Sequence, residues 1–186
     1  MNTLVIGCGS SVENGYGGHD TSLNSPWCAY RHHDHKNCVT VDIDAICSPD
    51  VVMDFTTGNT FEITKNFKGK KFDLIVLENL PTTIYYNNNN KIYNLVRNIL
   101  LISTETSYVF IPKAVNTMQV IACFYSHGFD LKIQSNDFRL ISGIISSFIG
   151  REFDNYILGK QIQNKMVKQS TGRETFPYLL FKRFDS

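Results

Sequence analysis

Four short apolar segments in the first half of the chain each run into a glycine or an acidic residue. They lie at positions 3–6, 38–44, 49–55 and 72–81. Strands of a parallel sheet are buried on both faces, so they appear in a sequence as nearly continuous apolar runs of this length. One such run ending in Gly, Asp or Glu arises easily by chance, but four in order seldom do. The pattern therefore predicts four strands with polar groups gathered at their carboxyl ends.

The second half alternates between helical and extended patterns. Apolar residues at helical spacing predict one helix over 91–101 and another between Ala114 and Tyr125 that ends near Gly128. Short apolar runs predict strands at 108–111, 129–133 and 178–184. Strands separated by helices indicate an α/β three-layer sandwich around a mostly parallel sheet.

Two long segments interrupt this alternation. Residues 10–37 are polar and rich in glycine and have no apolar stripe, so the helix expected after the first strand is shortened or replaced by a loop. We interpret 10–37 as a lid-like loop over the binding edge of the sheet, with a variable surface insertion as the alternative. Residues 135–177 form a late insertion before the last strand, and residues 1–186 as a whole are expected to be one domain.

The first strand leads directly into Gly7-Cys8-Gly9. Paired glycines allow a tight turn in which backbone N–H groups can approach a bulky polar ligand. A tight turn without any ligand remains the alternative. A dinucleotide fingerprint needs a third glycine three residues after Gly9 and an acid about twenty residues later, and neither Val12 nor Asp42 meets it.

Taken in order, the glycine turn, "VDID", "PDVVMDF" and "FDLIVLENLP" resemble the class I S-adenosylmethionine-dependent methyltransferases. The motifs cover about the first half of the chain. The resemblance implies a Rossmann-like methyltransferase sheet of seven strands, with the last strand inserted antiparallel beside the fifth. It also implies S-adenosyl-L-methionine as the cofactor and methyl transfer to an acceptor that the motifs do not identify.

The resemblance assigns a role to each motif. The glycine turn would wrap the methionine moiety, and the segment after the second strand would hold the ribose. The segment after the third strand would meet the adenine amine, and the end of the fourth would face the methyl group. The corresponding residues are Gly7, Cys8 and Gly9; Asp42 and Ile43; Asp54 and Phe55; and Glu78 and Asn79. Glu78 is the first candidate for a general base, and the alternative is an acid that only accepts N–H groups.

The chain departs from the family at two places. Val5 stands where an acid usually precedes the first glycine, and Ser10-Ser11-Val12 replaces a third glycine. These departures keep a second hypothesis open, a catalytically inactive methyltransferase-like module that binds a partner.

Composition narrows the class of protein. The chain has 186 residues, 42% of them hydrophobic and 19% charged, as in an ordinary globular protein, and no apolar stretch of membrane-spanning length. A formal net charge of +1 gives no electrostatic reason to expect nucleic acid or a membrane surface as a partner. Five cysteines without C-x-x-C spacing, together with the absence of a signal-peptide pattern, predict a cytoplasmic protein. The acceptor is therefore expected to be a small molecule or a protein, and nothing indicates an oligomeric state.

Two further groups of residues remain. Cys28, Cys38 and the histidines around His32–His35 are of types that bind Zn²⁺, but their crowding favours a solvated turn, so no metal site is predicted. Arg151 and Tyr156 are guesses for the substrate side, with a solvated turn as the alternative.

Overall fold

The computed structural model describes residues 2–7, 38–45, 49–78, 80–85, 90–111, 116–135 and 178–184. In chain order, the elements are β1 (Thr3–Ile6), β2 (Cys38–Asp42), β3 (Val51–Val52), α2 (Thr60–Phe67), β4 (Phe72–Leu77), the 3₁₀ helix η3 (Thr82–Tyr85), α3 (Lys91–Ile102), β5 (Ser103–Ile111), α4 (Thr117–Ser126), β6 (Phe129–Ser135) and β7 (Tyr178–Arg183). None of the helices in these ranges is both long and apolar enough to span a bilayer.

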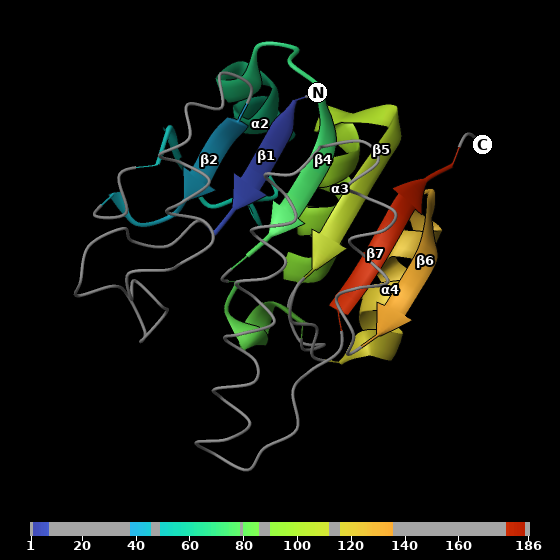
Figure 1. Ribbon diagram of the computed structural model, residues 1–186. Coiled ribbons are helices and arrows are strands. Elements are labelled where there is room, and N and C mark those ends of the chain that lie inside the picture. The colour runs from blue at the N-terminus through green and yellow to red at the C-terminus, as the bar shows by residue number, and fades with distance from the viewer. Residues whose placement is uncertain are drawn as a thin grey trace, which may run out of the picture.

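The strands form one sheet of seven in the order β3-β2-β1-β4-β5-β7-β6 (Figure 1). β1 pairs in parallel with both β2 and β4, and the parallel pairing continues to β3 on one side and β5 on the other. β7 lies between β5 and β6 and is antiparallel to both, so among the described strands it is the one that runs in the opposite direction to the rest of this sheet. The mostly parallel, seven-stranded Rossmann-like sheet and the antiparallel last strand beside the fifth are both confirmed.

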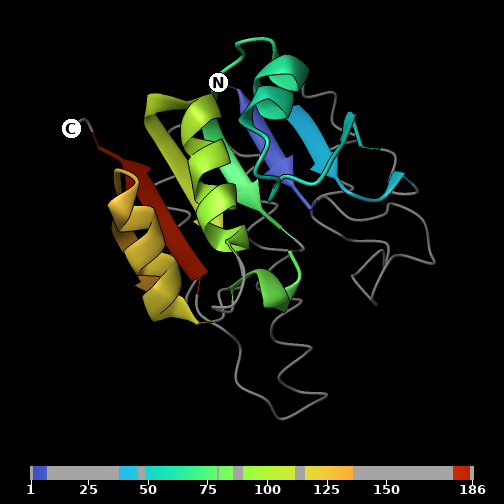
Figure 2. The same cartoon turned by 180° about the vertical axis from the view of Figure 1, so that it is seen from behind.

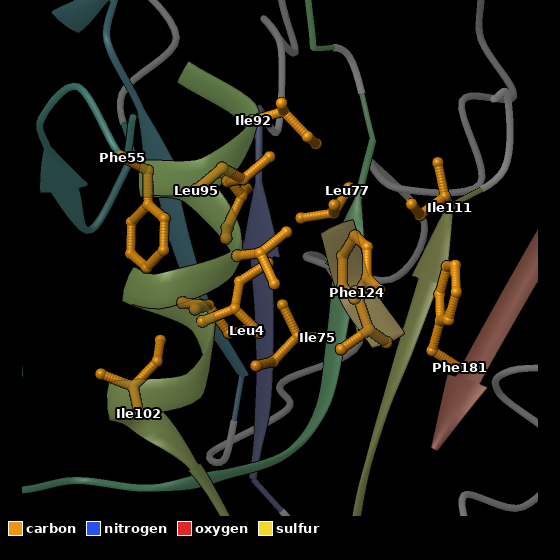
Figure 3. Close-up of a cluster of buried hydrophobic side chains, with 14 of the residues drawn as sticks. Leu4, Phe55, Ile75, Leu77, Ile92, Leu95, Ile102, Ile111, Phe124 and Phe181 are labelled. Carbon is orange, nitrogen blue, oxygen red and sulfur yellow. The ribbon is translucent and has the colours of Figure 1, made fainter. Parts of the chain in front are cut away.

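The three described helices α2, α3 and α4 cover one face of the sheet (Figure 2). Leu4, Ile75 and Leu77 point from the strands toward α3, which contributes Ile92, Leu95 and Ile102 to the same core (Figure 3). The alternate strand positions face the other way and are also buried: Val5, Leu74, Val76, Phe110 and Leu180. The sheet is thus apolar and buried on both faces, as the middle layer of an α/β sandwich requires.

α2 was not predicted from the sequence. Its buried face consists of Ile63 and Phe67, one helical turn apart, which is too short a stripe to stand out. The ring of Phe67 lies between two others, edge-on to Phe55 at 6.0 Å and to Phe72 at 5.6 Å between centroids. The helix ends at Lys68, which adopts the left-handed conformation. The two aromatic contacts of Phe67 hold the helix against the sheet.

Two strands differ from their predicted lengths. The predicted third strand, 49–55, pairs only over Val51–Val52, because Asp50 turns back to accept hydrogen bonds from Thr40 and Asp54 begins a turn. The predicted fifth strand, 108–111, begins earlier at Ser103, and an irregularity in its register against β4 separates the two parts.

Candidate functional site

β1 and β4 lie side by side at the point where the path of the chain across the sheet reverses. From β1 the chain moves outward to β2 and β3, and from β4 it moves the other way to β5. In open parallel sheets, ligands bind at such a switch point, outside the carboxyl ends of the strands. The carboxyl ends of β1, β2, β3 and β4 are therefore the candidate site.

Gly7 is the first residue beyond β1 at this edge. Its φ of +74° is a left-handed conformation that disfavours residues with a Cβ, which explains the glycine. Its N–H donates to the carbonyl of Val41 in β2 at 2.8 Å. The hydrogen bonding between β1 and β2 therefore continues through Gly7, and the turn begins after it. Cys8 and Gly9, which were predicted to complete the glycine turn, lie outside the described residues.

Gly7 stands level with acidic residues on both neighbouring strands. Ile6 pairs with the residue before Asp42 on one side and with the residue before Glu78 on the other. The N–H of Glu78 donates to the carbonyl of Ile6 at 2.9 Å, which extends the pairing of β1 and β4. Three of the predicted site residues are thus brought together at the ends of three adjacent strands.

Asp42, the last residue of β2, was predicted to hold the ribose. Its Oδ1 accepts the backbone N–H of Asp44 at 3.0 Å, so a local turn orients the carboxylate. The next residue, Ile43, is 69% exposed although it is aliphatic. Val52, in register with Asp42 on β3, is 54% exposed and was not predicted as a site residue. An apolar surface therefore flanks the carboxylate at the outer side of the site.

Asp54 begins the loop that follows β3, and its side chain is exposed. Its Oδ1 accepts two hydrogen bonds from Thr56, from the backbone N–H at 2.8 Å and from the hydroxyl at 2.6 Å. Within the described part of the chain, Oδ2 accepts none. The turn therefore holds this exposed carboxylate by one of its two oxygens.

Phe55 was predicted beside Asp54 as a cofactor contact. Its side chain is only 3% exposed and belongs to the core (Figure 3). There its ring packs edge-on against that of Phe67. Only its backbone remains available for a contact at the sheet edge.

The loop after β3 is tied to α3 by residues that the sequence analysis did not single out. Nδ2 of Asn98 donates to the carbonyls of Phe55 and Thr57, both at 2.9 Å, and Arg97 donates to the carbonyl of Gly58 at 2.9 Å. A signal for Asn98 was present, because it lies three residues after Leu95 and would fall on the apolar face of the helix. A polar side chain on that face needs partners in the core.

Glu78 and Asn79 were predicted at the end of the fourth strand as catalytic residues. Glu78 is 8% exposed, so its side chain is largely buried at the edge of the sheet. Asn79 lies outside the described residues, as do Arg151, Tyr156 and the cluster around His32–His35. Among the described residues no group of three His, Cys, Asp or Glu side chains is arranged to hold a metal ion.

The segments after β4 and β5 meet on the other side of the switch point. Tyr85, in η3, is buried, and burial raises the pKa of its phenol well above the ordinary value. Its carbonyl accepts a hydrogen bond at 3.0 Å from Nδ2 of Asn116, which precedes α4. On this side of the site the phenol of Tyr85 is therefore buried and uncharged, and a partly buried hydrogen bond joins η3 to the residue before α4.

No protein-family model matches the sequence, and no curated protein matches it significantly. Solved structures do match it. The N-methyltransferase NodS from Bradyrhizobium japonicum, in complex with S-adenosyl-L-homocysteine, superposes with a TM-score of 0.51 at 10% identity, over 99% of this chain and 78% of that one. A TehB-like SAM-dependent methyltransferase from Corynebacterium glutamicum also gives 0.51, at 13% identity over 98% and 80% of the two chains.

An S-adenosylmethionine-dependent methyltransferase from Mesorhizobium loti gives the same score of 0.51 at 10% identity, covering 98% of this chain and 90% of its own. Identities this low carry information about the fold alone. The strand order, the direction of the last strand and these superpositions agree, and the chain has the fold of the class I S-adenosylmethionine-dependent methyltransferases.

Proposed function

We propose that this protein is an S-adenosylmethionine-dependent methyltransferase whose cofactor site is the carboxyl edge of β1, β2, β3 and β4. One observation carries the proposal: Gly7, Asp42 and Glu78 stand level across three adjacent strands at the switch point of the sheet. A left-handed glycine flanked by two carboxylates at this point suits a ligand with hydroxyl and amine donors.

The donors and acceptors at this edge fit the parts of the cofactor. Asp42 would accept hydrogen bonds from the two ribose hydroxyls. The adenine ring would lie against Ile43 and Val52, whose exposed aliphatic side chains suit its apolar faces. Asp54 would accept a hydrogen bond from the adenine amine through Oδ2. Gly7, with Cys8 and Gly9 after it, would pass beside the methionine moiety.

The bound cofactor supplies a methyl group that its sulfonium already makes electrophilic. The protein then has to hold the acceptor in line, and orientation of this kind can lower a barrier by roughly 7–11 kcal/mol. Glu78 lies at the end of the strand that would face the methyl group, where it would either take a proton from the acceptor or accept N–H groups from the ligand. The acceptor is a small molecule or a protein in this proposal.

One observation favours the alternative of a catalytically inactive binding module. Val5, at the position where the family usually carries an acid, is 1% exposed and lies among the buried apolar residues of the sheet. An interaction that the acid makes in the family is therefore missing here, and binding without turnover would follow if that interaction were essential.

Calorimetric titration with S-adenosylhomocysteine tests the proposal, with NAD as the control ligand. We expect binding of the first and not of the second, together with a rise in melting temperature. A ligand that binds only the native state adds about 2.7 kcal/mol at a hundred times its Kd. Failure of S-adenosylhomocysteine to bind at millimolar concentration would overturn the proposal. Binding without methyl transfer to any small-molecule or protein acceptor offered would favour the inactive module.

A further inference from the structure

The loop that carries Asp54 is held from behind by the helix layer. Asn98 is fully buried in α3, and its amide nitrogen spans the carbonyls of Phe55 and Thr57, more than forty residues earlier in the chain. Arg97, the preceding residue, donates to the carbonyl of Gly58. Three hydrogen bonds from α3 to the loop backbone and two from Thr56 to Asp54 thus connect the core to one exposed carboxylate.

Asn98 is an unusual choice for a residue that only stabilises the fold. Its Oδ1 is buried and has no hydrogen-bond partner in the described part of the chain. A buried polar atom left without a partner is unfavourable, and an apolar side chain on this helical face would avoid that cost. Departures of this kind from the rules of core packing are expected where a residue serves a site.

The backbone of residues 54–58 has few alternatives to these bonds. β3 ends at Val52, so the carbonyls of Phe55 and Thr57 lie beyond the ladder of the sheet, and Asn98 supplies the donor that a neighbouring strand would otherwise provide. Without that donor the two carbonyls would have to turn toward water, and the turn that Asp54 begins would move with them.

We propose that Asn98, assisted by Arg97, is a positioning residue that sets which base the site accepts. By fixing the backbone of the loop, Asn98 fixes where Oδ2 of Asp54 points, and that oxygen selects a base bearing an exocyclic amine. The proposal rests on the proposed function, because it requires an adenosyl ligand at this edge of the sheet.

Base selectivity tests this proposal apart from overall stability. S-adenosylhomocysteine and S-inosylhomocysteine differ in the base, where the amine is replaced by a carbonyl that Asp54 would repel. We expect the wild-type protein to prefer the adenosyl ligand by at least about tenfold in Kd. In Asn98→Ala the preference should fall to about twofold, because Oδ2 is no longer held in place.

Ile102→Ala is the matched control on the same helix. Ile102, the last residue of α3, is equally part of the core (Figure 3), and its aliphatic side chain makes no hydrogen bond to the loop carbonyls. This variant should lose stability and keep the tenfold preference. If Asn98→Ala does not fold, Arg97→Met removes the bond to Gly58 without emptying the core, and its preference should fall to about threefold.

Hydrogen exchange provides a second readout that needs no ligand. The amides of Thr56 and Thr57 should exchange faster in Asn98→Ala than in Ile102→Ala at matched global stability. Failure of the wild type to bind S-adenosylhomocysteine would overturn the proposed function itself. Binding with an unchanged base preference in Asn98→Ala would leave that function standing and would overturn the role given to Asn98, as would equal affinity of the wild type for both ligands.

Discussion

The turns after β2 and β3 both present a carboxylate at the proposed site, but they are built differently. The turn after β2 is closed by a hydrogen bond between residues two apart, from the N–H of Asp44 to Asp42. The loop after β3 combines a similar local turn at Asp54 with hydrogen bonds from α3 to its backbone. The carboxylate of Asp42 accepts a hydrogen bond within its own turn, whereas that of Asp54 lies in a loop that is also held by a distant helix.

This difference separates two kinds of mutational effect. A change at Asp42 should act on ligand affinity directly, because the carboxylate itself would bind two hydroxyls. Changes at Asp54 or in α3 should act on one contact to the base and on the conformation of the loop. A local turn can be recognised in a sequence and altered by substituting one of its own residues. A loop held by hydrogen bonds from a distant helix can also be altered by a substitution in that helix.

The largest expected effect is that of Asp42→Ala on cofactor binding. Hydrogen bonds to a charged group are worth roughly 1.5–3 kcal/mol each, so losing those to the ribose should weaken S-adenosylhomocysteine by at least about tenfold. Calorimetry measures the loss, and Asp44→Ala is the control because it keeps the backbone N–H that orients Asp42. Comparable losses in both variants, or no loss in Asp42→Ala, would show that the ribose site is misplaced.

Asp54→Asn should have a smaller effect. The amide keeps an oxygen for the two hydrogen bonds from Thr56 and places an NH₂ group where Oδ2 would meet the adenine amine. We expect affinity for S-adenosylhomocysteine to fall about threefold to tenfold, since a single exposed hydrogen bond is lost. The melting temperature of the free protein should stay nearly constant. Unchanged affinity would show that Asp54 does not contact the ligand, so that of the two turns only the one after β2 would contribute a carboxylate to binding.

Ile43→Ser should have the smallest effect of the three. The side chain is 69% exposed in the protein, so its removal should not destabilise the fold, but it should remove apolar contact with the base. Burial of apolar surface is worth about 25 cal/mol per Å². Loss of the part of the Ile43 side chain that the base would cover should therefore raise Kd roughly twofold to fivefold. Phe61→Ser is the control, because Phe61 is 71% exposed on α2. A loss of equal size in both variants would mean that Ile43 contributes nothing specific to binding.

The positions of the strands and of the acids at their ends could be predicted from the amino-acid sequence. β1, β2 and β4 begin where the apolar runs predicted, although β2 ends at Asp42 and β4 at Leu77, before the ends of those runs. Gly7, Asp42, Asp54 and Glu78 lie at or just after the ends of their strands, as expected. These features depend on residues that are adjacent in the chain, so hydrophobic pattern and turn chemistry are enough to reveal them.

The support of these acids depends on contacts between segments that lie far apart in the chain. α2 has two buried residues and a weak pattern, and it is held by rings from β4 and from the loop after β3. The third strand is cut short by the hydrogen bonds that Asp50 accepts from Thr40 and by the turn at Asp54, and Asn98 donates to the carbonyl of Phe55 from 43 positions later in the chain. Contacts between segments so distant leave no periodic trace in a single sequence, because each partner looks like an ordinary polar or aromatic residue until the fold brings the two together.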